Sequence, residues 1–552
     1  MTDDTTKHLP ENLKQLMEAS DMKASALAKA SGVSVATLSR ILAGQVNPGV
    51  HHMAAIAKAL DTTIDALMAA PESHMGRPRP QNKIEADVRN ETDILVSFVL
   101  EDTKYSPNEA ARLLANAATG SWVHSWTEEL VDPNLTPLPR PTVAMRTGPR
   151  SVAVDVAFPE ALFEAGSIAS LISVITASCT STGARVEDIR IPPVLLRTYR
   201  GPSFGVVGLR ERTQKYGRPL LSATMRPMAG LSPRMYAQAV FETLKGGVDI
   251  TCDPTALHNM PSNNWRDRFA YVAKAVDEAQ DATGEAKLHA ANVTAPTVEE
   301  MLNRAHYAME QETNAVMVDS GVVGWSGLQS LANFCHENEL VLCALGGRAL
   351  HNGPLSQQLV AKLLRFIGAD IVSVGSPLRG NAMARRNVKG ITRSLEAHNM
   401  QAFPEGMIVF DQPTCGIPAA WPACGGGHNA WHMPQLLDAM GNDIIIQCGG
   451  STMGHPWGSL AGATANRTAL EALVKARTTG VHLPTEGRAI LQEASKSSSE
   501  LKEALKYWQE GAFLFGVINN DDKAKLEAMV VSNKRKPDLK SIDTSNEEEP
   551  SS

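Results

Sequence analysis

Two glycine-rich stretches late in the chain have the residue types needed to bind phosphate. They read Ala-Cys-Gly-Gly-Gly at 423–427 and Cys-Gly-Gly-Ser at 448–451. A glycine leaves its backbone N–H open to phosphate oxygens, although glycines also serve tight turns, so each stretch alone is ambiguous. Because both follow consecutive apolar runs late in the chain, we predict a phosphate site there. Its candidate residues are Gly425, Gly426, Gly449 and Gly450.

Eight short apolar runs from residue 218 onward alternate with helix-length segments. Eight strands with intervening helices over roughly 250 residues are typical of a closed (β/α)8 barrel, the TIM-barrel fold. We therefore predict a barrel over residues 216–520, with the phosphate site at the carboxyl ends of its strands. The predicted strands read LLSAT, VDIT, LHAANV, AVMVD, LVLCAL, DIVSVG, WPACGG and DIIIQCGG.

A compact α+β domain is predicted before the barrel, over residues 91–215. Strand-like apolar runs occupy 94–100 and 151–158. Helical patterns occupy 107–118 and 160–178. Strands and helices mixed in this way indicate a sheet covered by helices.

The N-terminal residues 1–72 predict an all-α head, because apolar residues recur there at helical spacing and no strand pattern appears. Residues 73–90 are rich in polar residues and proline and predict a solvated linker. Residues 521–552 are charged and rich in serine, which predicts a disordered tail. The chain is thus expected to contain three folded domains.

One segment of the head has the features of a helix-turn-helix. The spacing predicts a helix over 25–30, a turn at Gly32 and a second helix over 35–42 that Ser34 caps. The segment resembles the Cro/repressor family of DNA-binding domains, and the resemblance implies DNA as a partner. It implies that Ser34, Ala36 and Thr37 face base edges, and that Arg40 reaches a phosphate or a base.

The charge of the head keeps a second interpretation open, in which the head is a helical module for protein contacts. Residues 1–74 carry six Lys or Arg against eight Asp or Glu, a net charge of −2. Phosphate neutralisation would then be weak, and DNA affinity would depend on paired half-sites or on the linker arginines Arg77 and Arg79. The net charge of −7 over the whole chain gives no general attraction to nucleic acid.

Composition and cysteine spacing predict a cytoplasmic protein. The chain shows no signal pattern and no run of 18 apolar residues, so we expect no membrane contact. Seven cysteines occur without a CxxC pair, which indicates neither a zinc site nor a disulfide framework. Cys252, at a predicted strand end, is interpreted as a small buried hydrophobe rather than a nucleophile.

Long stretches over residues 91–480 resemble the large subunit of ribulose bisphosphate carboxylase (RuBisCO), and more closely the RuBisCO-like (form IV-like) proteins. The resemblance implies a small α+β domain of ferredoxin-like type before a (β/α)8 barrel, in agreement with the patterns above. The similar stretches read ATGSWVHSWTEE, EDIRIPP, KYGRPLL, RPMAGLS, GGVDIT, NNWRDRF, AWHMP and STMGHPWGSLAGATANRTALEA.

The same resemblance implies that the family's metal site is lost. Carboxylating members hold Mg2+ with a K-D-D-E pattern, in which the lysine becomes a carbamate, and here that pattern reads Cys252-Asp253-Pro254-Thr255. Asp253 stands at the position that does not bind the metal. The other three side chains do not supply the hard oxygens that Mg2+ requires. We therefore expect no metal and no cofactor.

Groups that move protons in the family are also replaced. Arg226 and Met228 stand where the family has two lysines, and a guanidinium stays protonated near neutral pH. Glycines at 346 and 347 stand where a histidine would be. Other pocket positions implied by the resemblance are Arg379 at a catalytic lysine, and Asn116 and Ser178 at a glutamate and an asparagine that the family donates across a dimer interface. His351 and His455 are interpreted as structural or ligand-orienting.

The resemblance implies that several of the family's phosphate-binding positions are retained in this sequence. Gly449 and Gly450 match one phosphate site, and Arg348 matches the guanidinium of the other. The remaining matched positions are Ser121 and Trp122 at a Thr-Trp pair, Ser373 at a phosphate-binding histidine, and Cys424 at a serine.

Together these features predict a transcriptional regulator whose non-carboxylating barrel binds a phosphorylated sugar-like ligand. The family builds its active site from two subunits, so we expect a homodimer that presents two heads to a palindromic operator. An alternative is a metal-independent RuBisCO-like isomerase or enolase-type enzyme, for which no replacement base is identified. Ribulose bisphosphate carboxylation itself is disfavoured by the lost metal ligands.

Overall fold

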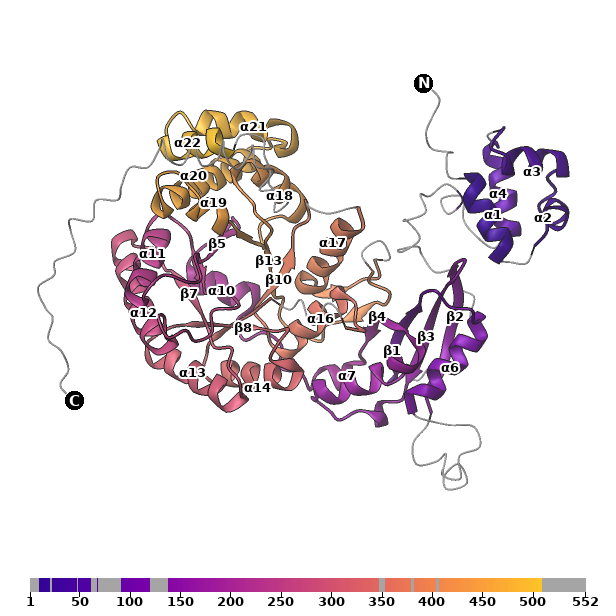
Figure 1. The fold of residues 1–552 in the computed structure, drawn as a ribbon, viewed down its shortest axis with the longest axis horizontal. Helices are drawn as coiled ribbons and strands as arrows, with labels where there is room; N and C mark the ends of the chain where they lie inside the picture. The colour runs from indigo at the N-terminus through magenta and orange to yellow at the C-terminus, as the bar shows by residue number, and fades with distance from the viewer. Residues whose placement is uncertain are drawn as a thin grey trace, which may run out of the picture. The chain divides into compact units, whose positions relative to one another are not determined.

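The computed structural model describes residues 9–19, 22–46, 48–60, 67, 91–119, 138–346, 353–378, 382–403 and 407–508 (Figure 1). The predicted linker at 73–90 and the predicted tail at 521–552 lie outside the described residues. No helix among the described residues is both long enough and apolar enough to cross a bilayer.

The described part of the head is helical, as predicted. Its helices are α1 (Leu9–Ala19), α2 (Ala24–Ser31), α3 (Val35–Leu42) and α4 (Val50–Ala59). Leu13, Leu27 and Leu38 are fully buried in one apolar core that all four helices share. Gly32 ends α2 with a φ of 68°, which glycine adopts at little cost. The predicted helix-turn-helix, formed by α2 and α3, is confirmed.

The next domain is a four-stranded antiparallel sheet with the strand order β2-β3-β1-β4. Its βαββαβ element order is that of a ferredoxin-like domain and agrees with the predicted class. The elements are β1 (Ile94–Leu100), α6 (Pro107–Thr119), β2 (Arg140–Gly148), β3 (Ser151–Phe158), α7 (Ile168–Thr176), α8 (Cys179–Thr182) and β4 (Arg185–Arg190).

One predicted helix in this domain is shorter than its pattern suggested. The segment 160–178 was expected to be one helix, but only a 3-10 turn (η4, Glu160–Leu162) and α7 form. Gly166 interrupts them with a φ of 72°, and Ser167 then caps α7 by accepting the backbone N–H of Ser170. The strands β2 and β4 were not predicted.

The barrel contains all eight predicted strands. It closes in the order β10-β13-β14-β5-β6-β7-β8-β9, and the pairings between its strands are parallel. The strands are β5 (Leu220–Thr224), β6 (Ile250–Cys252), β7 (Leu288–Asn292), β8 (Ala315–Asp319), β9 (Val341–Leu345), β10 (Ile371–Gly375), β13 (Trp421–Cys424) and β14 (Ile445–Gln447).

A helix follows each barrel strand along the chain, and two further helices, at 193–196 and 205–213, precede the first strand (Figure 1). Several begin at a side chain that accepts a backbone N–H three residues on, as Ser232, Asn264 and Thr297 do. The helices are α9 (Pro193–Leu196), α10 (Gly205–Thr213), α11 (Pro233–Lys245), α12 (Trp265–Thr283), α13 (Val298–Glu310), α14 (Gly324–Glu337), α16 (Gln357–Ile367), α17 (Ala382–Glu396), α18 (Met433–Met440), α19 (Gly449–Met453), α20 (Ser459–Thr478), α21 (Leu483–Ala494) and α22 (Ser499–Trp508). Short pieces complete the fold: β11 (Asn399–Met400), β12 (Gln412–Pro413) and the 3-10 turn η6 (Ala430–His432).

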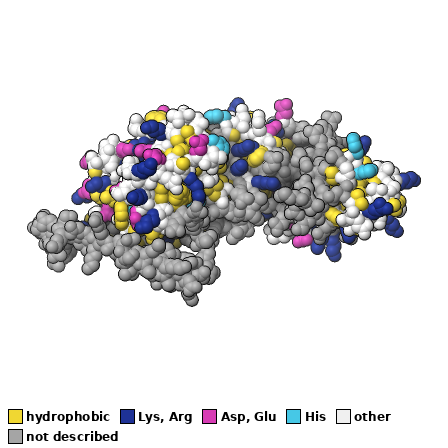
Figure 2. All heavy atoms as spheres, turned by 90° about the horizontal axis from the view of Figure 1, so that it is seen from above, with side chains coloured by type: hydrophobic (Ala, Val, Ile, Leu, Met, Phe, Trp, Pro, Cys, Tyr) yellow, Lys and Arg dark blue, Asp and Glu magenta, His cyan; other side chains and the backbone are white. Residues whose placement is uncertain are grey.

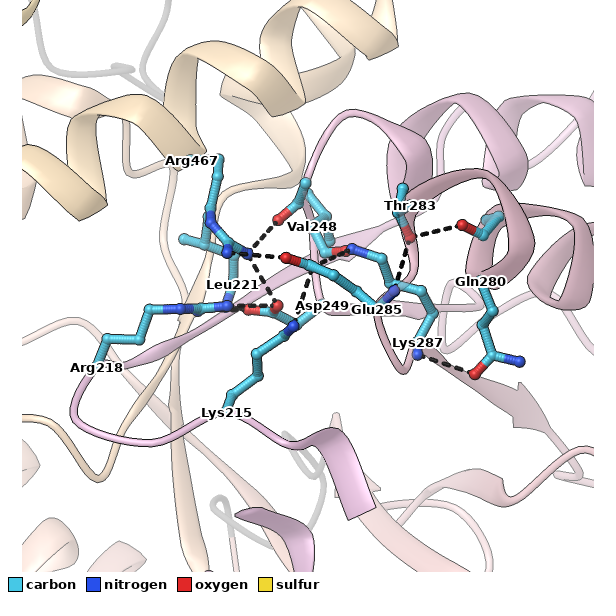
Figure 3. A network of polar contacts seen from close by, with 12 residues as sticks. Lys215, Arg218, Leu221, Val248, Asp249, Gln280, Thr283, Glu285, Lys287 and Arg467 are labelled. Carbon is cyan, nitrogen blue, oxygen red and sulfur yellow. Dashed lines mark hydrogen bonds and ion pairs between the residues drawn. The ribbon is translucent and has the colours of Figure 1, made fainter. Parts of the chain in front are cut away.

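A charged network ties β5 and β6 to α20 at the amino ends of the strands (Figure 3). The Asp249 carboxylate, fully buried before β6, accepts two hydrogen bonds of 2.7 Å from Arg218 and lies 3.3 Å from Nη1 of Arg467. The Glu285 carboxylate accepts hydrogen bonds from Nζ of Lys287 at 2.9 Å and from Nη2 of Arg467 at 3.1 Å. Residues at the amino ends of TIM-barrel strands contribute to stability, whereas functional sites lie at the carboxyl ends, where we expect the candidate site.

Candidate functional site

Cys252 ends β6 at the position where carboxylating relatives carry the carbamate lysine, according to the resemblance above. Its thiol is fully buried and lies 3.2 Å from Oγ1 of Thr224. Burial raises the pKa of the Cys252 thiol to about 11, although the Thr224 hydroxyl opposes this. A thiol that stays protonated at neutral pH is a poor nucleophile, which supports the interpretation of Cys252 as a buried hydrophobe.

Asp253 is fully buried in a polar cluster beside Cys252. Its Oδ1 accepts a 2.6 Å hydrogen bond from the Tyr236 hydroxyl and lies 3.2 Å from Nε2 of His289. Its Oδ2 accepts Nε of Arg268 at 3.2 Å. Burial alone would raise the pKa of Asp253, but Arg268, His289 and Tyr236 outweigh it and hold this pKa well below its usual range. The Asp253 carboxylate therefore interacts with side chains of the protein itself, namely those of Tyr236, Arg268 and His289.

The residues at this place do not fit Mg2+. Pro254 has no donor atom in its side chain, and Thr255 offers one neutral hydroxyl where the family has a carboxylate. The neighbouring carboxylate, that of Asp253, already faces a guanidinium. Within the part of the chain that the structure describes, no group of three His, Cys, Asp or Glu side chains could hold a metal ion.

The glycine-rich turn after β14 forms the start of the short helix α19. A Cβ at Gly449 would lie 2.9 Å from the carbonyl oxygen and 3.2 Å from the amide nitrogen of Thr224, so glycine is needed for this close backbone approach. Gly450, the next residue, is exposed. A substitution at Gly449 would therefore move the backbone of β5 as well as any phosphate contact.

The turn after β13 is similarly constrained. A side chain at Gly425 would collide with the side chain of Gln447, and Gly426 and Gly427 adopt φ values of 131° and 72°. Cys424, directly before this turn, is fully buried, and burial raises its pKa. Gly425 and Gly426 thus retain backbone N–H groups at the turn, whereas the thiol of Cys424 presents no surface to solvent.

A cavity of about 460 Å3 opens at the carboxyl ends of β8, β9 and β10. Its volume lies in the range of small-molecule sites. Ser373, the predicted phosphate-binding position on β10, lines this cavity. Other lining residues are Ser320, Gly346, Gln357, Leu364 and Gly375.

Gly346 on the cavity wall fits against Asp319, which ends β8. The glycine has a φ of 77°, and a Cβ there would lie 2.7 Å from the carboxylate carbon of Asp319. The Asp319 carboxylate thus occupies the space that a side chain at 346 would need, while its Oδ1 accepts the backbone N–H of Gly321 at 3.0 Å. Nothing in the sequence indicates that Asp319 and Gly346 are neighbours. The close approach of the ends of β8 and β9 brings the Asp319 carboxylate against Gly346, which is one of the cavity-lining residues.

The remaining predicted pocket residues are scattered. Arg226 is exposed after β5, and its backbone N–H lies 3.0 Å from Sδ of Met453. Asn116 is exposed on α6, whereas Ser178 is fully buried. Nδ1 of His455 accepts the backbone N–H of Trp457 at 3.1 Å, and its Nε2 lies 3.1 Å from the Glu500 carbonyl, in agreement with a structural role. Outside the described residues lie Ser121, Trp122, Arg348, His351 and Arg379.

The recognition helix α3 exposes a mixed surface. Ser34 accepts the backbone N–H of Thr37 at 3.1 Å, and the two hydroxyls lie 2.8 Å apart, so these predicted base contacts also form the helix cap. Ala36 and Arg40 are exposed. The exposed Val35 was not among the predicted contacts, although its place at the first turn of the helix could have shown it.

Charge is unevenly distributed in the head. Residues 22–60, here called the acid-free segment, contain four Lys or Arg and no Asp or Glu. All four basic side chains, together with His51 and His52, are exposed, and Figure 2 shows such side chains on the head at the right of the view. The acidic residues that gave residues 1–74 their net charge of −2 all lie outside this segment. Within this segment, the basic residues available for phosphate neutralisation are therefore not offset by acidic ones. The basic residues of the segment are Lys23, Lys29, Arg40 and Lys58.

Thiol reactivity gives a direct test of burial around the barrel. Six of the seven cysteines are buried, and Cys415 is half-exposed. We expect one thiol per chain to react rapidly with Ellman's reagent at neutral pH, and seven after denaturation. Replacing Cys415 with serine should abolish the rapid phase, whereas Cys252→Ser should leave it unchanged. Two or more rapid thiols in the native protein would contradict the burial described here.

Comparison with known families agrees with the domain order. The family model described as ribulose bisphosphate carboxylase large chain, catalytic domain, matches residues 205–508, which is more than half of the chain. The model for the N-terminal domain of the same large chain matches residues 84–195. A helix-turn-helix model matches residues 13–67.

Proposed function

Since the chain belongs to the ribulose bisphosphate carboxylase large-chain family and carries a helix-turn-helix domain before it, we propose that it is a DNA-binding transcriptional regulator. In this proposal the barrel binds a phosphorylated sugar-like ligand and does not carboxylate it. Ligand binding then alters the affinity of the head for DNA.

The acid-free segment is the observation that carries the DNA-binding half of the proposal. DNA-binding proteins neutralise backbone phosphates with Lys and Arg, and nearby carboxylates would oppose this. Lys29 and Arg40 lie on the two helices of the helix-turn-helix, and both are exposed. A protein-contact module would not require the exclusion of every acidic residue from α2 to α4.

Support for the ligand-binding half comes from the carboxyl ends of the barrel strands. The cavity lined by Ser373 has room for a small molecule, and the turns at 425–427 and 449–450 keep backbone N–H groups without side chains beside them. Phosphate is the natural ligand of such turns in this fold. The replacement of the family's K-D-D-E pattern by Cys252-Asp253-Pro254-Thr255 argues against carboxylation of that ligand.

A homodimer would connect the two halves. Cyclic dimers are the commonest assemblies, and a two-fold axis matches a palindromic operator. A ligand at the barrel could change the spacing of two heads without touching DNA itself. We propose this arrangement as the route of regulation.

The decisive experiment measures binding of the full-length protein to DNA from its own upstream region, by fluorescence anisotropy over a range of salt concentrations. We expect affinity to fall steeply as salt rises and to exceed that for unrelated DNA. Arg40→Ala should weaken binding about tenfold. Lys274→Ala, at an exposed lysine of α12, is the matched control and should have no effect.

The same assay then tests regulation, by adding sugar phosphates or inorganic phosphate at fixed DNA concentration. A change in apparent affinity would support ligand control. Absence of any salt-sensitive preference for the upstream DNA would overturn the proposal of a DNA-binding regulator.

A further inference from the structure

The outward face of α3 has an unusual chemistry for a surface that would contact DNA. Leu38 and Ile41 turn into the head core, and positions 35, 36, 39 and 40 share the opposite, exposed side of the helix. Among the described residues of the head, Val35 is the most exposed large apolar side chain, at 55%. Together with Ala36, it makes the first turn of this face apolar.

The neighbouring hydroxyls do not change this character. Ser34 and Thr37 are bound to each other at the cap of α3, where the Ser34 hydroxyl also receives a backbone N–H. The cap therefore holds Val35 and Ala36 in a fixed helical position at the start of the helix. What projects beside them is one hydroxyl, Ser39, and one guanidinium, Arg40.

The surroundings of this face indicate which partner covers it. A second protein would suit an exposed valine equally well, but every Asp or Glu is missing from the acid-free segment that carries this valine, and its Lys and Arg side chains are all exposed. An apolar contact on a segment that carries Lys and Arg but no Asp or Glu fits the major groove, where phosphates flank the base edges. Val35 and Ala36 would then meet bases.

Base edges differ in what they offer to such side chains. Asn and Gln are the side chains that pair with adenine, and Asp and Glu accept from cytosine, whereas apolar side chains contact the methyl group of thymine. The exposed side of α3 carries no amide and no carboxylate. Apolar contact with thymine methyls is thus the direct readout open to Val35 and Ala36, and Arg40 is the one side chain of α3 able to form the bidentate pair with guanine.

We propose that α3 recognises thymine methyl groups, through Val35 and Ala36, in an operator half-site that is rich in A·T pairs at the contacted positions. This inference rests on the proposed DNA-binding function and deepens it, because it names the class of base pair that the head reads.

Uracil substitution tests this inference, since deoxyuridine keeps the base pairing of thymidine and lacks only the methyl group. Sequences bound by the full-length protein are first selected from a random duplex library. The best duplex is then remade with each thymidine replaced in turn by deoxyuridine. We expect one or two positions in each half-site to lose about fourfold in affinity, which is the effect of one buried methyl-sized group.

Two variants assign the loss to the proposed side chain. Val35→Ser removes the methyl groups from an exposed site without disturbing the core, so it should bind thymidine and deoxyuridine duplexes equally at one of those positions. Lys29→Ala, the matched control, should weaken binding to both duplexes by the same factor and leave their ratio unchanged. Thermal melting of both variants should match that of the parent protein, because both side chains are exposed.

The outcomes separate this inference from the function on which it rests. If no duplex is selected from the library, the proposed DNA-binding function fails. If duplexes are selected but uracil substitution has no effect, or if Val35→Ser keeps the full uracil sensitivity, the head binds DNA by other contacts and thymine recognition is overturned.

Discussion

Replacing Asp253 with alanine is expected to destabilise the barrel by about 3–5 kcal/mol, because it leaves a fully buried guanidinium without its carboxylate. Arg268 and Tyr236 both lose their bonds to this group, and neither can turn to solvent. Chemical denaturation followed by tryptophan fluorescence would measure the change. Asp277→Ala, at an exposed aspartate of α12, is the matched control and should cost less than about 0.5 kcal/mol.

We expect the same carboxylate to make the stability of the barrel depend on pH. The pKa of Asp253 in the folded protein lies below its usual 3.8, so its contribution is fully present above that value and is lost as the pH falls below it. The difference in stability between the parent and Asp253→Ala should therefore be smaller at pH 3 than at pH 7. An equal difference at both values would contradict the lowered pKa.

Ribulose bisphosphate, CO2 and Mg2+ together are expected to give no carboxylation product with this protein. The stretch that holds the metal in carboxylating members reads Cys252-Asp253-Pro254-Thr255 here, and enzymes accelerate their reactions at least about 10⁶-fold through their complete catalytic machinery. Incorporation of radiolabelled CO2 into acid-stable product, with and without EDTA, is the measurement. The expected rate is that of the protein-free control.

A single restored lysine should not recover the reaction. Cys252→Lys supplies the amine for a carbamate, but Pro254 and Thr255 still offer no carboxylate to a metal. Turnover of the parent protein that depends on both CO2 and Mg2+ would show that another set of residues performs the chemistry.

The barrel was predictable because parallel strands are buried on both faces and therefore read as continuous apolar runs. The runs LLSAT and AVMVD became β5 and β8 with the expected bounds. The strand β4 was missed because its sequence, RVEDIR, is largely charged. Its Asp188 is nevertheless fully buried, paired at 2.9 Å with Lys362, which lies far along the chain on α16. Local patterns cannot reveal a partner so distant in sequence.

The sequence predicted which residues of the family's site are replaced, but it did not predict the geometry of the candidate site. The replaced quartet and the glycine turns are visible in the sequence, whereas the contact of Gly449 with the backbone of Thr224 is a property of the closed barrel. The net charge of −2 over residues 1–74 hides the basic character of the acid-free segment, because all of the acidic residues lie before α2 or after α4. The helix boundaries show that α2, α3 and α4 all lie within this segment and carry no acidic residue.

The fit between Gly346 and Asp319 makes two distant positions depend on each other during evolution. A descendant that gained a side chain at 346 would meet the carboxylate of Asp319 at once, and would also have to change the backbone from its φ of 77°. Loss of the Asp319 side chain alone would leave a gap beside Gly346 and would remove the acceptor of the Gly321 backbone N–H. We therefore expect these two positions to change together or not at all, so that the lineage has no single-step return to a side chain at position 346.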